Sequence, residues 1–457
     1  MKPLPALLIS LTAALSPVAA QQTLPDGSNL SFTYGVAANT SRVSITDPGD
    51  HVWKLQCSDN LSNWVDLETL KVHNGRLNRN ISHSGGHLFF RTVYSNALQS
   101  TVSSTTTNAL VLPVTPYDYD NPTLPPAFAV NPIAGQDNML ATNLTTDNGA
   151  KLGRILFYDK RLSINHTISC SSCHQQSAGF SDPRQFSVGF EGGLTGRNSM
   201  GLSNARWYQR RSFFWDERAA TLEDQVLLPI QNEVEMGMTL DVLETRLNAE
   251  PFYVELFTQT FGAGSPVVTR DRISRALAQF VRSIISVQSR YDTARATNFA
   301  IGANWTNQEE QGRQIFNAPG SCSACHGTDN FVPGPNIFNN GLEFPYVDAG
   351  KGAITGVAAD NGKFKVGSLR NIQLTAPYMH DGRFATLEQV VDFYSTGVVD
   401  NPNLSPPLRL PPPQGGGVSR PNFTAAQKAA LVAFLKTLTD PNLATNAKYS
   451  DPFNYGD

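Results

Sequence analysis

Residues 168–176, ISCSSCHQQ, contain two cysteines one helical turn apart, Cys170 and Cys173, followed directly by His174. This spacing suits a c-type haem, because both thiols can add to the porphyrin vinyl groups while the histidine ligates the iron. A zinc site would need four clustered ligands, and a thioredoxin-like dithiol would not need the histidine. The motif therefore favours haem attachment over a zinc knuckle or a redox dithiol.

The same pattern recurs in the C-terminal part of the chain, where Cys322, Cys325 and His326 lie in the string CSACH. Four of the five cysteines fall in these two motifs, so chance does not account for both. Cys57 is left without an internal partner and is predicted to be a buried free thiol. The sequence thus predicts two covalently bound haem c groups.

The first residues agree with haem attachment outside the cytoplasm. Lys2 precedes an apolar run, LPALLISLTAALSPVAA, which ends in small residues at Val18 and Ala20, as in a cleavable secretory signal. This run is too short to cross a bilayer, and no other run is long enough. We predict a signal peptide over residues 1–20, a mature protein with no membrane span, and a periplasmic or secreted location.

The overall composition narrows the range of partners. Charged residues make up 16% of the 457 residues, and the formal net charge is −3. Neither nucleic acid nor an anionic membrane surface is favoured by this balance. The length predicts two to four domains.

The N-terminal part of the chain differs from the remainder. Short alternating runs separated by turn clusters such as DPGD and HSGG predict an all-β module over residues 21–112. The module resembles the immunoglobulin- or fibronectin-like appendages of secreted bacterial proteins. Residues 113–134 are rich in proline, which predicts a semi-extended linker.

The rest of the chain follows one plan twice. A helix with a matching pentad precedes each haem motif, GRILF at 153–157 and GRQIF at 312–316, and each half closes with an amphipathic helix. These are the minimal elements of a cytochrome c domain. The predicted fold class is therefore mainly α, with one cytochrome c domain at residues 135–300 and a second at residues 301–445.

The histidines limit how the two irons are ligated. The chain has eight, and only His166, His174, His326 and His380 lie outside the predicted β module and its flanks. His174 and His326 belong to the haem motifs. His166 lies just before the first motif and is predicted to be an exposed loop residue, so at least one iron is expected to lack a second histidine.

Three further stretches accompany the motifs: RNSMGLSNARW, FFWDERAATLEDQVLLPIQNEVEMG and VGSLRNIQLTAPYMHDGRFATLEQVVDFYSTG. Together they closely resemble the di-haem cytochrome c peroxidase family, which includes the MauG-type enzymes, over residues 135–440. The resemblance implies an enzyme that reduces hydrogen peroxide with electrons from a protein donor. The predicted β module lies outside it.

The resemblance also implies a peroxidatic site at the first haem. The family's distal pocket contains a glutamate, a glutamine and a proline, which match Glu235, Gln225 and Pro229. A carboxyl group there can move a proton between the two peroxide oxygens, as base and then as acid. Without the resemblance, a second interpretation fits Glu235: an exposed carboxylate at the end of a helix, since another glutamate, Glu233, lies two residues away. Trp215 matches the family's electron-relaying tryptophan between the haems; a buried interface aromatic is compatible with that role.

This chain departs from the family's histidine-capped peroxidases at the first haem. Their capping histidine is replaced by Phe190, in the string SVGFEGG. Phenylalanine cannot ligate iron. The first iron is therefore expected to be five-coordinate and open to peroxide in the fully oxidised protein.

A second departure concerns the C-terminal haem. The methionine ligand of those peroxidases is replaced by Tyr394, as in the MauG-type enzymes. A phenolate favours ferric iron and lowers the reduction potential relative to a thioether. Two alternatives stay open: Met379 is the ligand instead, or Tyr394 is a core residue on one helical stripe with Leu387, Val390 and Val391.

The family also binds one Ca²⁺ between its haem domains. An asparagine side chain and two backbone carbonyls form that site, and they match Asn198, Thr375 and Pro377. Oxygen ligands suit this hard cation, although the same residues also suit ordinary turns.

The sequence as a whole predicts a MauG-like di-haem c-type peroxidase. Its electron donor is expected to be a small cytochrome or copper protein. Three alternatives remain: a di-haem electron-transfer cytochrome without peroxidase activity, a MauG-type oxidase that modifies the side chains of a partner protein, and a binding protein whose β module carries the main role. A homodimer is also left open.

Overall fold

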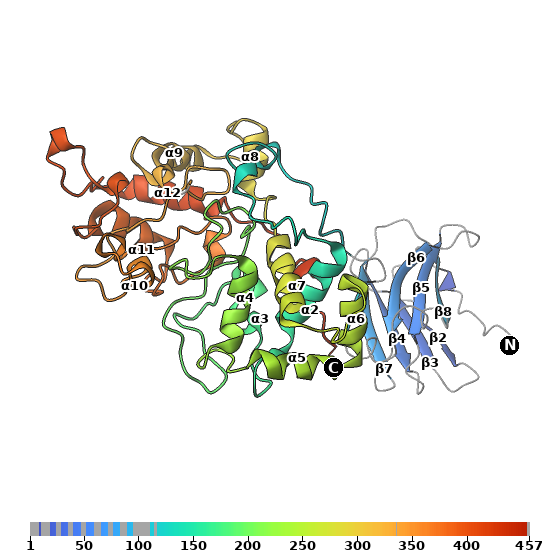
Figure 1. The fold of residues 1–457 in the computed structure, drawn as a ribbon. Coiled ribbons are helices and arrows are strands. Elements are labelled where there is room, and N and C mark those ends of the chain that lie inside the picture. Colours follow the sequence, from blue (N-terminus) through green and yellow to red (C-terminus); the bar gives the residue numbers. More distant parts are fainter. Residues whose placement is uncertain are drawn as a thin grey trace. The chain divides into compact units, whose positions relative to one another are not determined.

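The computed structural model describes residues 110–454 except 114–116 and 335, together with the backbone of eight strands between residues 9 and 94. The chain divides into two compact units (Figure 1). One unit comprises residues 1–116, 250–255 and 452–457, and the other comprises residues 117–249 and 256–451.

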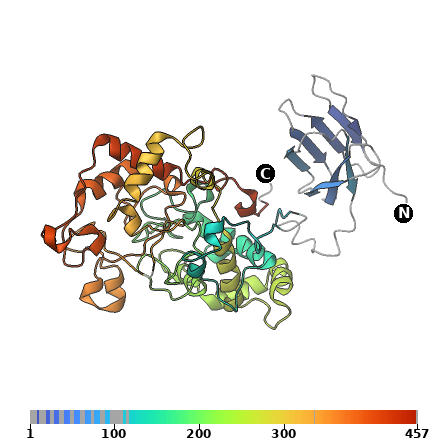
Figure 2. The same ribbon diagram turned by 90° about the horizontal axis from the view of Figure 1, so that it is seen from above.

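The strands of the first unit form two four-stranded antiparallel sheets, coloured blue in Figure 1 and Figure 2. One sheet has the order β1 (Ile9–Ser10), β8 (Phe89–Tyr94), β5 (Val52–Ser58), β6 (Val65–Lys71). The other has the order β2 (Ala19–Thr23), β3 (Asn29–Tyr34), β4 (Thr40–Thr46), β7 (Arg76–Ser82).

Several predictions fall on this first unit. Strands β1 and β2 include residues of the predicted signal peptide, residues 1–20. The side chain of Cys57, in β5, lies outside the described residues. The likeness to immunoglobulin or fibronectin modules and the domain boundaries stay predictions.

The second unit is mainly helical, as the sequence predicts. The described helices are α2 (Asp147–Tyr158), α3 (Cys170–Cys173), α4 (Leu222–Gln231), α5 (Leu240–Asn248), α6 (Pro251–Phe261), α7 (Arg270–Ser283), α8 (Arg290–Ala296), α9 (Asn307–Phe316), α10 (Lys351–Thr355), α11 (Leu387–Asp392) and α12 (Ala425–Lys436). Within the residues that the structure describes, no helix combines the length and the apolar character needed to cross a bilayer.

The two halves of this unit repeat one helix pair. Helix α2 packs against α7, and α9 packs against α12. A Cβ atom added to Gly153 would lie 1.9 Å from the carbonyl oxygen of Ala276, and one added to Gly312 would lie 2.0 Å from that of Ala430. The glycine that opens each matching pentad therefore lets the two helix backbones touch at their crossing.

We expect Gly312→Ala to destabilise the haem-loaded protein by at least about 1–3 kcal/mol, because the new methyl group meets a backbone carbonyl that cannot turn aside. Gly302→Ala is the matched control, since an added Cβ there has no neighbour within 4 Å. Denaturant unfolding of both variants measures the difference. Equal free energies of unfolding for the two variants would show that α9 and α12 can move apart at their crossing without loss of stability.

Part of the predicted linker is packed into the helical unit. Tyr119, Phe128 and Ile133 are buried, and the rings of Phe128 and Trp207 meet edge to face with centroids 4.7 Å apart. The prolines of this segment suggested an extended tether. Its aromatic side chains instead fix residues 117–134 on the helices, because burying them stabilises the unit.

Candidate haem sites

The first cysteine motif forms a short helix, α3, with Ser169 as its N-cap. His174 follows the helix, and its Nδ1 lies 2.9 Å from the carbonyl oxygen of Phe180. Since a carbonyl only accepts, Nδ1 carries the proton and Nε2 keeps its lone pair for a metal. Burial lowers the pKa of His174, so the imidazole is held in the neutral form that ligates iron.

The second motif has the same arrangement. A 3₁₀ turn covers Cys322–Ala324, and Nδ1 of His326 lies 2.8 Å from the carbonyl oxygen of Phe331. Burial lowers the pKa of His326 to about 4. The donor sets of both motifs fit a covalently attached haem, because each offers a neutral imidazole and two free thiols.

Glu235 lies on a turn that follows α4. The side-chain oxygen of Asn232 accepts a hydrogen bond of 3.1 Å from the backbone nitrogen of Glu235 and so shapes this turn. Glu235 is half-buried, and burial raises the pKa of its carboxyl group. Its charge also contributes to the raised pKa of Cys170 and of Cys173. The carboxyl group thus lies within electrostatic range of the first motif, whereas Glu233 is exposed.

Gln225 and Pro229 lie one helical turn apart on α4, the helix that leads into the Glu235 turn. Both are half-buried. Helix α4 is fixed to α7 by a buried ion pair in which Arg282 donates to Glu223 over 2.5 and 2.9 Å. The two predicted pocket residues therefore share one face of an anchored helix.

Phe190 lies beside the Glu235 turn. Its backbone nitrogen donates to the carbonyl oxygen of Glu235 over 3.1 Å. A Cβ added to Gly237 would lie 2.6 Å from the Phe190 ring, so the ring covers this turn. His166 is exposed, with a left-handed φ of 62°, which agrees with the loop position predicted for it.

Trp215 contacts both helical halves. Its indole nitrogen donates to the carbonyl oxygen of Asn198 over 2.8 Å, and its backbone oxygen accepts from Lys365 over 2.7 Å. The ring meets that of His380 edge to face, with centroids 6.4 Å apart. Trp215 therefore lies at the junction of the two halves; its role between the haems stays a prediction.

The three residues predicted to bind calcium lie in adjoining segments. Asn198 is buried, and its backbone nitrogen donates to the carbonyl oxygen of His380 over 2.8 Å. Thr375 and Pro377 precede that histidine by a few residues. The side-chain nitrogen of Asn198 donates to the carbonyl oxygen of Arg184 over 3.0 Å. The calcium site itself stays a prediction.

Tyr394 lies in a π-helical turn, Phe393–Gly397, that follows α11. Its hydroxyl oxygen is 3.3 Å from the side-chain nitrogen of Asn340, which donates to it. Burial raises the pKa of Tyr394 to about 12; Asn340 lowers it, and the Cys325 and Cys322 thiols raise it further. The phenol is thus half-buried and within electrostatic range of the second motif.

The predicted stripe that joins Tyr394 to Leu387 and Val391 is wrong. Those two residues belong to the core around α9 and α12. Tyr394 packs instead against a separate cluster formed by Leu342, Phe393, Val398 and Leu404. Tyr394 lies within the π turn, where the α-helical period of α11 does not continue.

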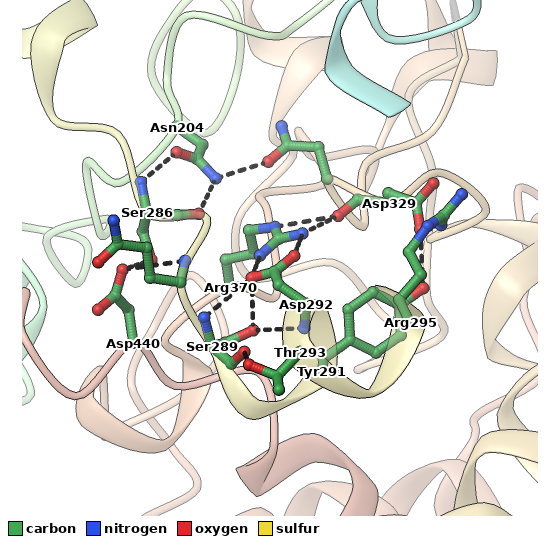
Figure 3. Close-up of polar contacts among 12 residues, drawn as sticks. Asn204, Ser286, Ser289, Tyr291, Asp292, Thr293, Arg295, Asp329, Arg370 and Asp440 are labelled. Carbon is green, nitrogen blue, oxygen red and sulfur yellow. Dashed lines mark hydrogen bonds and ion pairs between the residues drawn. The ribbon is translucent and has the colours of Figure 1, made fainter. Parts of the chain in front are cut away.

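A buried charge network fixes the loop that follows His326 (Figure 3). The guanidinium of Arg370 donates to both carboxylate oxygens of Asp292 over 2.8 Å and to the carbonyl oxygen of Asp329 over 2.7 Å. Asp329 also pairs with Arg295 and accepts from the Tyr291 hydroxyl over 2.8 Å. This network joins α8 to the segment after the second motif, and no motif or spacing in the sequence indicates it.

We expect Asp292→Asn to cost about 3–5 kcal/mol at neutral pH, because Arg370 then stays buried without its counter-charge. Burial would raise the pKa of Asp292, but the Arg370 hydrogen bonds outweigh it and lower that pKa. The stabilisation is therefore complete above the unfolded value of about 4 and is lost as the pH falls toward the lower folded value. As the pH falls from neutral to acid, the variant should therefore lose less stability than the parent protein.

Unfolding of the variant and its parent between pH 3 and pH 7 measures this effect. Asp271→Asn is the control, because its pair with Arg275 is exposed and worth little. If Asp292→Asn and Asp271→Asn lose the same stability, Arg370 must pair with another group when Asp292 is replaced.

Comparison with known proteins identifies the family to which the chain is similar. A family model described as di-haem cytochrome c peroxidase matches residues 147–298. The methylamine utilization protein MauG of Methylorubrum extorquens is 35% identical over 298 residues, covering 65% of this chain and 79% of that protein. Cytochrome c551 peroxidase of Nitrosomonas europaea is 36% identical over 295 residues, covering 64% and 79%.

Among solved structures, a MauG-like protein associated with microbial copper homeostasis superposes with a TM-score of 0.61 at 33% identity. The match covers 74% of this chain and 99% of that one. The chain therefore belongs to the di-haem cytochrome c peroxidase family and is a peroxidase-type oxidoreductase with haem cofactors. The resemblance predicted from the sequence is confirmed.

Proposed function

We propose that this chain is a periplasmic, MauG-like di-haem peroxidase that is open to hydrogen peroxide in its fully oxidised state. The observation that carries this proposal is the position of Phe190 beside Glu235: the Phe190 backbone nitrogen donates to the Glu235 backbone carbonyl oxygen, and the Glu235 carboxyl group is half-buried. The residue beside the acid–base group therefore has no atom that could close the iron's sixth position.

Each motif would hold one haem c through two thioether bonds and one imidazole. Cys170, Cys173 and His174 hold the first, and the hydrogen bond from His174 to the Phe180 carbonyl orients the ring. Cys322, Cys325 and His326 hold the second. The haem irons, when bound, supply the peroxide-binding site and store the two oxidising equivalents.

Glu235 acts as the acid–base group at the first site. Its carboxylate would take a proton from one peroxide oxygen and return it to the other, which would leave as water. A raised pKa suits this exchange, because a carboxyl group with a pKa nearer neutrality both accepts and releases a proton readily. Gln225 and Pro229 on α4 line the same pocket in this proposal, as an amide donor and an apolar wall.

Trp215 provides the route between the two sites. Its contacts with Asn198 on one side and with Lys365 on the other join the two halves. Tyr394 would hold the second haem together with His326, and an anionic phenolate oxygen would favour the oxidised metal. This ligand is the reason for placing the chain in the MauG-like branch.

A calcium ion held by the Asn198 side chain and by the backbone oxygens of Thr375 and Pro377 would tie the two halves together. The N-terminal strands would form an immunoglobulin- or fibronectin-like appendage with a binding role. Both statements rest on the sequence resemblance and on the adjacency of the three calcium residues.

A donor assay tests the proposed function. Reduced small c-type cytochrome and reduced blue copper protein are each mixed with the enzyme, and their oxidation is followed with and without hydrogen peroxide. A peroxidase oxidises at least one donor only when peroxide is present. Electron exchange without peroxide consumption would favour the electron-transfer cytochrome instead.

The 35% identity with MauG also favours a second candidate function, oxidation of a partner protein. In that case peroxide is consumed at the haems while neither small donor is oxidised. The oxidised side chain is then sought in the partner by mass spectrometry.

A further inference from the structure

Two atoms able to ligate iron share one hydrogen-bond donor near the second haem site. The side-chain nitrogen of Asn340 lies 3.3 Å from the hydroxyl oxygen of Tyr394 and 3.5 Å from the sulfur of Met379. An amide nitrogen carries two N–H groups and can serve both atoms at once. The phenol and the thioether therefore both lie within hydrogen-bond distance of a single nitrogen.

Met379 and Tyr394, which contact this nitrogen, both have uncommon backbone conformations. Met379 has a left-handed φ of 75°, a conformation that costs on the order of 1–3 kcal/mol for a residue with a side chain. Tyr394 lies in the π-helical turn. Both side chains pack against the same apolar cluster, which includes Leu342 and Phe393. Strain of this kind persists where the surrounding structure holds the residue in place, often for function.

The neighbouring Asn339 differs from Asn340, because its side chain makes contacts of a purely structural kind. It is buried, its side-chain oxygen accepts from the Gly341 nitrogen over 2.9 Å, and its side-chain nitrogen donates to the Asn361 carbonyl oxygen. These contacts hold the turn. Asn340 instead directs its donor to the two candidate ligands.

We propose that Asn340 is a positioning residue that holds Tyr394 and Met379 as alternative distal ligands of the second haem, with Tyr394 bound in the oxidised protein and Met379 in the reduced protein. This inference rests on the proposed function. A hard phenolate suits the ferric state, and a soft thioether suits the ferrous state.

The exchange of ligands consumes one electron and one proton. The protein donor supplies one electron, the Tyr394 oxygen leaves the metal and takes up one proton from solvent, and the Met379 sulfur forms the new bond. Asn340 gives up its hydrogen bond to the sulfur and keeps the one to the tyrosine. Reoxidation reverses each change.

The test compares Met379→Leu with its parent in the fully reduced, haem-loaded protein. We expect the parent's second haem to be six-coordinate, low-spin and closed to carbon monoxide. In the variant that haem should become five-coordinate and high-spin and should bind carbon monoxide. A variant whose reduced spectra equal those of the parent would overturn the exchange.

Tyr394→Phe separates this inference from the proposed function. If its oxidised spectrum equals that of the parent, Tyr394 is not a ligand, and both the exchange and the MauG-like assignment fail. If Tyr394→Phe changes the oxidised spectrum while Met379→Leu leaves the reduced one unchanged, only the exchange fails.

Asn340→Leu tests the positioning role, because leucine keeps the approximate shape without the donor. A hydrogen bond to a charged partner is worth about 1.5–3 kcal/mol, so its loss should shift the ligand equilibrium at least about tenfold away from the charged phenolate form and toward the thioether form. Tenfold corresponds to 59 mV for a one-electron couple, and because the oxidised form is the one destabilised, the second haem's potential should rise by that amount. An unchanged potential would show that Asn340 is only a packing residue.

Discussion

Replacing Glu235 by glutamine is expected to slow the reaction of the oxidised protein with hydrogen peroxide by on the order of a hundredfold. Glutamine keeps the size and the polarity of the side chain but cannot accept and return a proton. The half-buried position of Glu235 makes solvent a poor substitute, because burial already disfavours its charged form. Stopped-flow absorption after mixing with peroxide gives the rate.

Glu233→Gln is the matched control for this variant. It changes the same side chain on the same turn, two residues away, and Glu233 is exposed. The control should react at the parent rate, and both variants should retain both haems. If Glu235→Gln also reacts at the parent rate, Glu235 is a surface carboxylate, and the proton is moved by another group.

Replacing Phe190 by histidine is expected to close the first site in the oxidised protein. The Phe190 backbone is hydrogen-bonded to Glu235, so an imidazole introduced there starts close to the peroxide-binding position. If the ligated form is favoured by about 3 kcal/mol, the open fraction falls to roughly 1%, and the peroxide reaction slows by about a hundredfold. Electron paramagnetic resonance should show the loss of the high-spin ferric signal.

Leu194→His is the control, because Leu194 lies on the same loop and is 60% exposed. It should leave both the high-spin signal and the reaction rate unchanged. A high-spin signal that persists in Phe190→His would show that residue 190 does not reach the metal.

Much of the helical fold could be predicted from short-range patterns. Thr306 and Glu309 form a capping box at the start of α9, and Thr424 and Gln427 form one at the start of α12; both follow the spacing by which such a box is found in a sequence. The reason for the repeated pentad could not be predicted. Gly312 is small because it meets Ala430, and this contact exists only after two distant helices have packed.

The site was predictable where residue type and spacing carry the chemistry. The two motifs, and the resemblance around Glu235 and Trp215, indicated residues that the structure places near the first motif or at the junction of the halves. Periodicity gave the wrong neighbours for Tyr394, because an α-helical period does not anticipate a π turn. Asn340 and Arg370 were missed because their partners lie far along the chain.

The central claim is that the fully oxidised protein is open to peroxide. The most direct test adds one equivalent of hydrogen peroxide to the oxidised protein and follows the Soret and near-infrared absorption. An immediate spectral change without prior reduction is the predicted result. A spectrum that changes only after one haem has been reduced, or that does not change at all, would contradict the claim.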